Sequence, residues 1–229
     1  MAQSTLSDEF KFGFIFDLDG TLIDSAGQIS RAVNKTLQSR EKASRPENEI
    51  LKLIGLPASS LFNHLVLTES ETAEIVSEFR LQLSLLINES NLAYDDALHF
   101  IRKLKSEKRF VAVATSKPTD LAKSVIDNSQ YQNLVDHVIG IGVYEPKPNP
   151  GMIIAILTKF NLTGGVMFGD RPEDMSAAIN AGINAIGIAQ SSFTKEELML
   201  AGARRAFNNF LELMIDFENS GVEIIDYFN

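Results

Sequence analysis

The sequence contains no cysteine among its 229 residues. This absence excludes a disulfide framework, a thiol nucleophile and a cysteine-ligated metal site. The first ten residues lack the basic segment and long apolar run of a secretory signal, and no apolar stretch is long enough to cross a membrane. We therefore expect a cytoplasmic protein with no membrane partner.

Positive charge is also scarce. The chain has 21 lysines and arginines against 30 aspartates and glutamates, which gives a formal net charge of -9. A nucleic-acid-binding surface needs a basic face, so no nucleic-acid partner is expected. An anionic substrate would instead be held by a few local cations. The hydrophobic content of 45% is that of a globular chain with enough material for a core.

Short apolar runs, which predict buried strands, alternate with amphipathic segments, which predict helices. The expected strands are residues 11–16, 110–115, 137–142, 165–169 and 184–189. The expected helices between them are residues 95–107, 118–128, 150–160 and 172–181. This alternation predicts an α/β fold, a Rossmann-like doubly wound parallel sheet with right-handed crossovers.

The alternation is interrupted between the first two strands, where the pattern is helical only. Thr68 and Glu71 predict a capping box. Apolar stripes, interpreted as internal packing, contain Ile75, Phe79, Leu83 and Leu86, and Leu61 and Leu65. We therefore predict a discontinuous core of residues 1–24 and 92–229 and an inserted all-helical cap domain of residues 25–91. No role is assigned to the apolar and acidic segment 221–229.

Polar residues follow the expected strands, at the edge where open α/β sheets bind ligands. Asp17 and Asp19 come after the first strand and, because strand side chains alternate, point to the same side. Two such carboxylates repel each other unless a cation lies between them, and Mg²⁺ prefers oxygen ligands of this kind. An ordinary Asp-Gly turn is the alternative, but the whole string from Phe16 to Leu22 is more specific.

Two further motifs carry groups suited to phosphate. The Thr115 hydroxyl and the backbone N–H groups around Ser116 are placed to cradle phosphate oxygens, although such residues are also common at helix N-termini. Lys147 stands between Pro146 and Pro148, which restrict the local backbone. A fixed ammonium neutralises phosphate charge, while a solvated surface lysine is the alternative.

The fourth motif runs from Asp170 to Asp174. Asp170 ends a strand, and Asp174 lies in a first helical turn, where the helix dipole favours a carboxylate. Asp174 is thus a candidate helix cap as well as a metal-site residue. Arg171 is expected to pair with either acid or to point toward a substrate. Together the four motifs supply the groups that phosphoryl transfer requires, and a carboxyl phosphate is one established route.

With these four motifs in this order over nearly the whole chain, the sequence resembles the haloacid dehalogenase superfamily, in its phosphoglycolate phosphatase-like branch. The resemblance implies that Asp17 is the nucleophile and that Asp19 is the general acid–base. It also implies that Thr115, the Ser116 N–H group and Lys147 bind the phosphate.

The same resemblance implies a Mg²⁺ cofactor and a mobile cap. The metal would be held by the Asp17 carboxylate, the Asp19 main-chain carbonyl and Asp170, with Asp174 supporting its water shell. Cap closure would exclude water from the reaction. The resemblance also indicates that residues 55–57 form a cap loop facing the site, although a helix-terminating turn explains them equally well.

The predicted function is hydrolysis of a small phosphorylated metabolite through an aspartyl phosphate. A phosphomutase, a phosphonatase and a non-catalytic phospho-binding module are the alternatives. Asp19 argues against a dehalogenase, and Ile29 occupies the place of the cap histidine of phosphomutases. The phosphonatase reaction needs a cap lysine, for which the candidates are Lys35, Lys42 and Lys52.

Substrate identity and oligomeric state stay open, since phosphoglycolate, a sugar phosphate and a nucleoside monophosphate all suit the motifs. A basic stretch in the first part of the cap is interpreted as a solvated helix face. In the alternative interpretation, one of its cations meets the anionic end of the substrate. Its members are Arg31, Lys35, Arg40, Lys42 and Arg45.

Overall fold

The computed structural model describes residues 11–65, 72–87, 92–191 and 193–229. The capping box expected at Thr68 and Glu71 lies outside these residues. Within the described part of the chain, no helix has both the length and the apolar character needed to cross a membrane.

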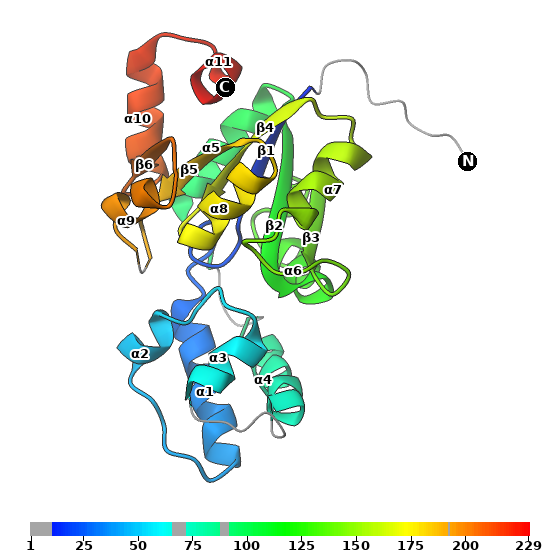
Figure 1. The fold of residues 1–229 in the computed structure, drawn as a ribbon, viewed down its shortest axis with the longest axis vertical. Helices are drawn as coiled ribbons and strands as arrows, with labels where there is room; N and C mark the ends of the chain where they lie inside the picture. Colours follow the sequence, from blue (N-terminus) through cyan, green and yellow to red (C-terminus); the bar gives the residue numbers. More distant parts are fainter. Residues whose placement is uncertain (1–10, 66–71, 88–91, 192) are drawn as a thin grey trace, which may run out of the picture.

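The core is a parallel sheet of six strands (Figure 1). The strands are β1 (Phe12–Phe16), β2 (Phe110–Pro118), β3 (His137–Ile141), β4 (Gly164–Gly169), β5 (Asn184–Ile188) and β6 (Arg205–Phe207). Their order is β3-β2-β1-β4-β5-β6, so the chain starts in the middle and winds outward in both directions. Every expected strand is present, and the predicted doubly wound parallel sheet is confirmed. Only β6 was not expected.

Helices cover both faces of the sheet because successive strand side chains point to opposite sides. One face carries α5 (Asp95–Ser106), α6 (Thr119–Asp127), α10 (Phe210–Ser220) and α11 (Ile224–Phe228). The other carries α7 (Gly151–Lys159), α8 (Pro172–Asn180) and α9 (Lys195–Leu200). Along β1, Phe14 and Phe16 face the first layer and Ile15 faces the second.

A helical insertion follows β1. It contains α1 (Ala26–Ser39), α2 (Glu47–Leu51), α3 (Ala58–Leu65) and α4 (Thr72–Ile87), which lie together beyond one end of the sheet (Figure 1). The apolar stripes pack inside it as expected, with the Phe62 and Phe79 rings 5.4 Å apart. The segment that leads into the insertion lies beside the segment that returns to the core, where the backbone N–H of Asp24 donates to the Leu92 carbonyl (2.8 Å). The exact boundaries at residues 24/25 and 91/92 stay a prediction.

The C-terminal segment 221–229, to which the sequence pattern assigns no role, packs on the aromatic face of the sheet. Phe228 is fully buried, with its ring 5.9 Å from that of Phe14 and 5.3 Å from that of Phe168. The Asn184 side chain donates to the Phe228 carbonyl (3.0 Å). The segment is therefore part of the core and not a loose tail.

Candidate active site

The predicted site residues meet at one edge of the sheet, where the strands of the parallel sheet end. Asp17 follows β1, Thr115 lies near the end of β2, and Asp170 follows β4. Lys147 comes from the loop that leads into α7. All four side chains are buried, with at most 7% of their surface exposed. The convergence that the sequence predicted for this edge is thus present.

Lys147 is the cation at the centre of this group. Its ammonium lies 2.7 Å from Asp17 Oδ1, contacts Asp174 Oδ1 and donates to the Ala114 carbonyl (3.1 Å). Burial alone would lower the pKa of Lys147, but the two carboxylates outweigh it and raise the pKa. The side chain is therefore a fixed positive charge, and the alternative of a solvated surface lysine is wrong.

Three carboxylates gather beside Lys147. Oxygen atoms of Asp17, Asp170 and Asp174 lie within 4.8 Å of one another, and all three residues are buried. Burial, together with the neighbouring negative charge of Asp17, raises the pKa of both Asp170 and Asp174. A divalent cation would relieve this crowding, and a set of buried carboxylate oxygens suits Mg²⁺. The donor set therefore fits the metal that the sequence implies.

Hydrogen bonds from neighbouring loops orient Asp170. Thr21 Oγ1 donates to Asp170 Oδ1 (2.9 Å), and the Ser191 hydroxyl donates to the other oxygen. Gly20 has a φ of 83°, and a Cβ at this position would lie 2.4 Å from Asp170 Oδ2. Only glycine therefore allows the first motif to turn so close to the carboxylate of the fourth.

Asp174 has one of the two roles that its position suggests, that of a helix cap, while its role as a metal-site residue stays a prediction. Asp174 Oδ2 accepts the backbone N–H of Arg171 (3.1 Å) and so caps α8, while Oδ1 contacts Lys147. The expectation for Arg171 was different: its side chain pairs with Glu173 (3.2 Å) and donates to the Ile54 carbonyl of the cap. The Arg171 side chain therefore pairs with neither Asp170 nor Asp174, and the glycine at position 55 leaves room for it beside the cap loop. A contact of this side chain with a substrate stays a prediction.

Asp19 lies outside the acidic cluster. Asp19 Oδ2 is 2.8 Å from the Lys117 ammonium, and Oδ1 accepts the Ser25 hydroxyl (2.6 Å). The two carboxylates of the first motif thus pair with different lysines, Asp17 with Lys147 and Asp19 with Lys117. A metal contact through the Asp19 main-chain carbonyl stays a prediction.

The end of β2 is irregular where phosphate binding is expected. Thr115 pairs with Gly140 of β3, but the next paired residue of β2 is Pro118. Ser116 and Lys117 therefore have no partner residue on β3, as in a β-bulge, a feature that re-aims groups near active sites. Thr115 Oγ1 accepts the backbone N–H of Lys117 (3.2 Å), which fixes the turn.

A cavity of about 60 Å³ separates these groups from the cap. Its core side contains Asp17, Asp19, Thr115, Ser116 and Lys117, and its cap side includes Ile29, Gly55, Leu56, Phe79 and Leu83. Gly55 and Leu56 of the loop at residues 55–57 line the cavity, and the loop also turns the chain between α2 and α3, so both interpretations of it hold.

Sequence reasoning missed the residues that support the site. Thr21 and Ser25 lie in or just after the first motif, and Lys117 lies directly after Ser116. Their proximity in sequence was a signal that could have included them. Ser191 had no such signal, because only the winding of β5 next to β4 brings it to Asp170.

Comparisons with known proteins bear on this arrangement. A family described as haloacid dehalogenase-like hydrolase matches residues 14–188. A phosphoglycolate phosphatase from Colwellia psychrerythraea is 27% identical over 89% of this chain and 96% of its own length. A probable phosphatase, IndB, from Dickeya dadantii is 27% identical over 87% of this chain and 90% of its own length.

Solved structures agree with the fold. The crystal structure of a predicted phosphoglycolate phosphatase from Haemophilus somnus 129pt superimposes with a TM-score of 0.81 and 25% identity. The match covers 91% of this chain and 98% of that one. The resemblance inferred from the four motifs is confirmed, and this chain belongs to the haloacid dehalogenase-like hydrolases.

Proposed function

We propose that this enzyme is a magnesium-dependent phosphatase that hydrolyses a small phosphorylated metabolite through an aspartyl phosphate on Asp17. That the chain is a phosphatase of its family follows from the family match and from its curated relatives. The observation that supports the finer proposal is the meeting of Asp17, Lys147 and the acidic cluster at the sheet edge, where Asp17 also lines the pocket beneath the cap. A cytoplasmic location stays a prediction.

In the first step a carboxylate oxygen of Asp17 attacks phosphorus, and the bond from phosphorus to the ester oxygen breaks. Lys147, held by ion pairs and a carbonyl, keeps Asp17 in place and balances the charge of the phosphoryl oxygens. The Thr115 hydroxyl and the Ser116 N–H group complete the cradle. Asp19 donates a proton to the departing oxygen, which leaves as an alcohol.

In the second step Asp19 accepts a proton from water, and the resulting hydroxide attacks phosphorus. The bond from phosphorus to Asp17 then breaks, so Asp17 is regenerated and inorganic phosphate is released. Asp19 suits both steps because it lines the pocket while its hydrogen-bond partners, Lys117 and Ser25, hold it apart from the acidic cluster.

Mg²⁺ would be held by the Asp17 carboxylate, Asp170 and the Asp19 main-chain carbonyl, with Asp174 beside them. When bound, it supplies positive charge toward the phosphoryl oxygens and balances the crowded carboxylates. Thr21 and Ser191 prepare this site by fixing the orientation of Asp170.

The lining of the pocket favours a phosphatase over the alternatives. Ile29 lines the pocket, so the chain presents an alkyl group where a phosphomutase would present a histidine. The imine-forming lysine of a phosphonatase would have to reach the same pocket. Among the described residues, none of the cap lysines lines it.

A phosphate-release assay over a panel of phosphorylated metabolites tests the proposal. Phosphoglycolate, sugar phosphates and nucleoside monophosphates belong in the panel, and phosphoglycolate comes first because curated relatives carry that name. We expect release with Mg²⁺, loss of activity in excess EDTA and recovery when Mg²⁺ is restored. Full turnover in EDTA would contradict the metal assignment, and isomerisation of a bisphosphorylated sugar would favour a mutase.

A further inference from the structure

The cap side of the active-site pocket is almost entirely hydrocarbon. The cap contributes Ile29, Leu56, Leu61, Phe79 and Leu83 to the lining, together with smaller apolar groups. Among the described residues that line this pocket, Arg80 is the only one from the cap with a polar side chain. The leaving group of the substrate therefore meets an apolar wall with a single cation.

An apolar wall discriminates against hydroxyl groups. A hydroxyl group that is buried without a hydrogen-bond partner weakens binding, and a sugar phosphate carries several hydroxyl groups. A short chain of methylene groups has no hydrogen bonds to lose against the same surface, and the burial of its apolar area favours binding. The wall thus favours a leaving group without hydroxyl groups on its cap side.

Arg80 is placed to meet a charged group at the edge of this wall. It lies on α4 one position after Phe79 and three before Leu83, both of which line the pocket. Its side chain is exposed, and it forms no ion pair or hydrogen bond with the described residues. Lys117, the other cation of the pocket, is already paired with Asp19.

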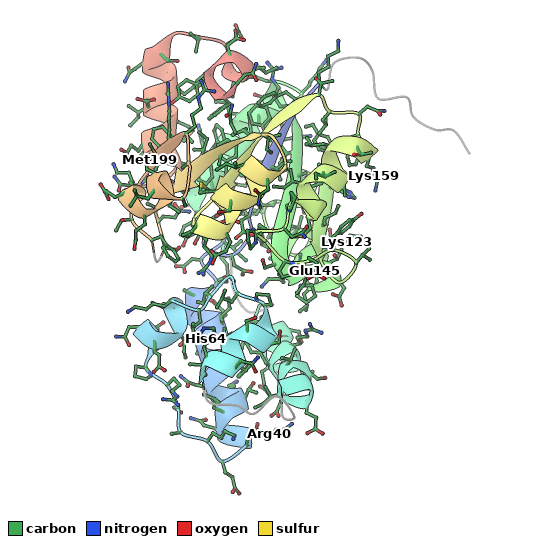
Figure 2. All side chains as sticks on the ribbon, viewed as in Figure 1. Arg40, His64, Lys123, Glu145, Lys159 and Met199 are labelled. Carbon is green, nitrogen blue, oxygen red and sulfur yellow. The ribbon has the colours of Figure 1, made fainter. Side chains whose placement is uncertain are left out.

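The basic stretch at the start of the cap does not compete for this role. Arg40 pairs with Glu74 and Glu78 (3.1 Å each) and lies at the end of the cap remote from the sheet (Figure 2). Arg31 is exposed on α1 and does not line the pocket. The basic stretch therefore contributes no residue to the pocket lining, whereas α4 contributes Arg80.

Building on the proposed function, we propose that Arg80 binds a carboxylate at the far end of the leaving group. The preferred substrate is then a phosphomonoester with a short carbon chain that carries no hydroxyl groups and ends in a carboxylate. An arginine fork receives two carboxylate oxygens at once, which makes it a selective partner.

Three matched esters test this assignment: phosphoglycolate, ethyl phosphate and glycerol 3-phosphate. The measured quantity is the ratio of kcat/KM for phosphoglycolate to kcat/KM for ethyl phosphate. In Arg80→Gln we expect this ratio to fall about tenfold to a hundredfold, mainly through KM for phosphoglycolate, since a charge-assisted hydrogen bond is lost. Arg31→Gln is the matched control, and it should leave the ratio unchanged.

An unchanged ratio in Arg80→Gln would overturn the inference, as would faster turnover of glycerol 3-phosphate than of phosphoglycolate by the wild-type enzyme. Faster turnover of ethanediol bisphosphate would overturn the choice of a carboxylate. If no ester is hydrolysed, the proposed function fails. Calorimetry then measures the dissociation constants of phosphoglycolate and ethyl phosphate, and their ratio replaces the ratio of kcat/KM values. A preference in binding that depends on Arg80 would then support the inference by itself.

Discussion

Each aspartate of the first motif has its own lysine. Lys147 contacts Asp17 and is held additionally by Asp174 and a carbonyl, whereas Lys117 contacts Asp19 alone among the carboxylates. The sequence motif indicates two acids on one side of a strand end, but it does not say which cation serves which acid. In the proposed mechanism, this division of the lysines distinguishes the nucleophile from the proton-transfer group two residues away.

Replacement of Asp17 tests the nucleophile. Asp17→Asn is nearly isosteric, and its amide cannot attack phosphorus, so we expect p-nitrophenyl phosphate turnover to fall by at least about a thousandfold. Lys147 keeps Asp174 and the Ala114 carbonyl as partners, so the fold should persist. Phosphate release and thermal unfolding, measured together, check both parts. An active Asp17→Asn enzyme would remove Asp17 from this role.

Replacement of Asp19 tests proton transfer. General acid catalysis matters most when the departing oxygen is strongly basic, and it contributes about 10²–10⁴-fold. Asp19→Asn should therefore slow alkyl phosphates much more than p-nitrophenyl phosphate. A linear free-energy plot of kcat/KM against leaving-group pKa measures this difference. Parallel plots for the wild-type and variant enzymes would contradict the assignment, and Ser25→Ala should show a smaller change of slope.

At the residue scale the sequence predicts which side chains meet at the sheet edge, because three of them lie at the end of an apolar run; their catalytic roles stay predictions. Asp17, Thr115 and Asp170 all follow residues that the sheet buries, so the topology brings them to one edge. Supporting residues such as Ser191 depend on which strands are neighbours. Strand order is a tertiary property, and the spacing of motifs does not encode it.

At the scale of elements, the hydrophobic periodicity of the sequence locates the strands and helices. The residues at which each strand or helix ends depend on local contacts. The sequence places the end of the second strand at Thr115, before Ser-Lys-Pro. In the structure β2 continues to Pro118 through the irregular pairing with β3. The strand β6, with only three residues, Arg205–Phe207, has too short an apolar run to stand out.

The loop between α2 and α3 gives a prediction at this scale. Gly55 has a φ of 91°, and a Cβ there would lie 2.3 Å from Arg171 Cδ. Gly55→Ala should therefore destabilise the protein by about 1–2 kcal/mol and push the cap loop away from Arg171. Because this loop lines the pocket, we also expect kcat/KM to fall by about tenfold to a hundredfold.

Gly27→Ala is the matched control, since Gly27 lies in α1 and a Cβ there has nothing within 4 Å. It should leave both stability and kcat/KM close to the wild-type values. Urea unfolding and steady-state kinetics measure the two effects. Wild-type behaviour of Gly55→Ala would show that the contact between Arg171 and the cap loop does not hold the cap in position.

At the scale of the whole molecule, the sheet edge that carries the candidate site packs on one aromatic layer. Phe16 immediately precedes Asp17, and Phe168 precedes Asp170 by two residues; their rings stack at 4.7 Å. The Phe100 and Phe228 rings pack on the same layer from α5 and α11. The end of the chain thus supports the strands that carry the site. No local sequence pattern indicates that the C-terminal helix packs on this aromatic layer. For this reason the sequence alone assigned no role to segment 221–229.

Truncation of Phe228 tests this packing. Phe228 is fully buried against Phe14 and Phe168, and removal of such a ring costs about 3–5 kcal/mol through lost burial and the cavity that remains. Phe228→Ala should lower the free energy of unfolding by that amount, while the folded fraction keeps its KM. Leu211→Ala, at a residue 54% exposed on α10, is the control and should change stability little. A Phe228→Ala protein as stable as this control would mean that the terminal helix does not close the aromatic layer in solution.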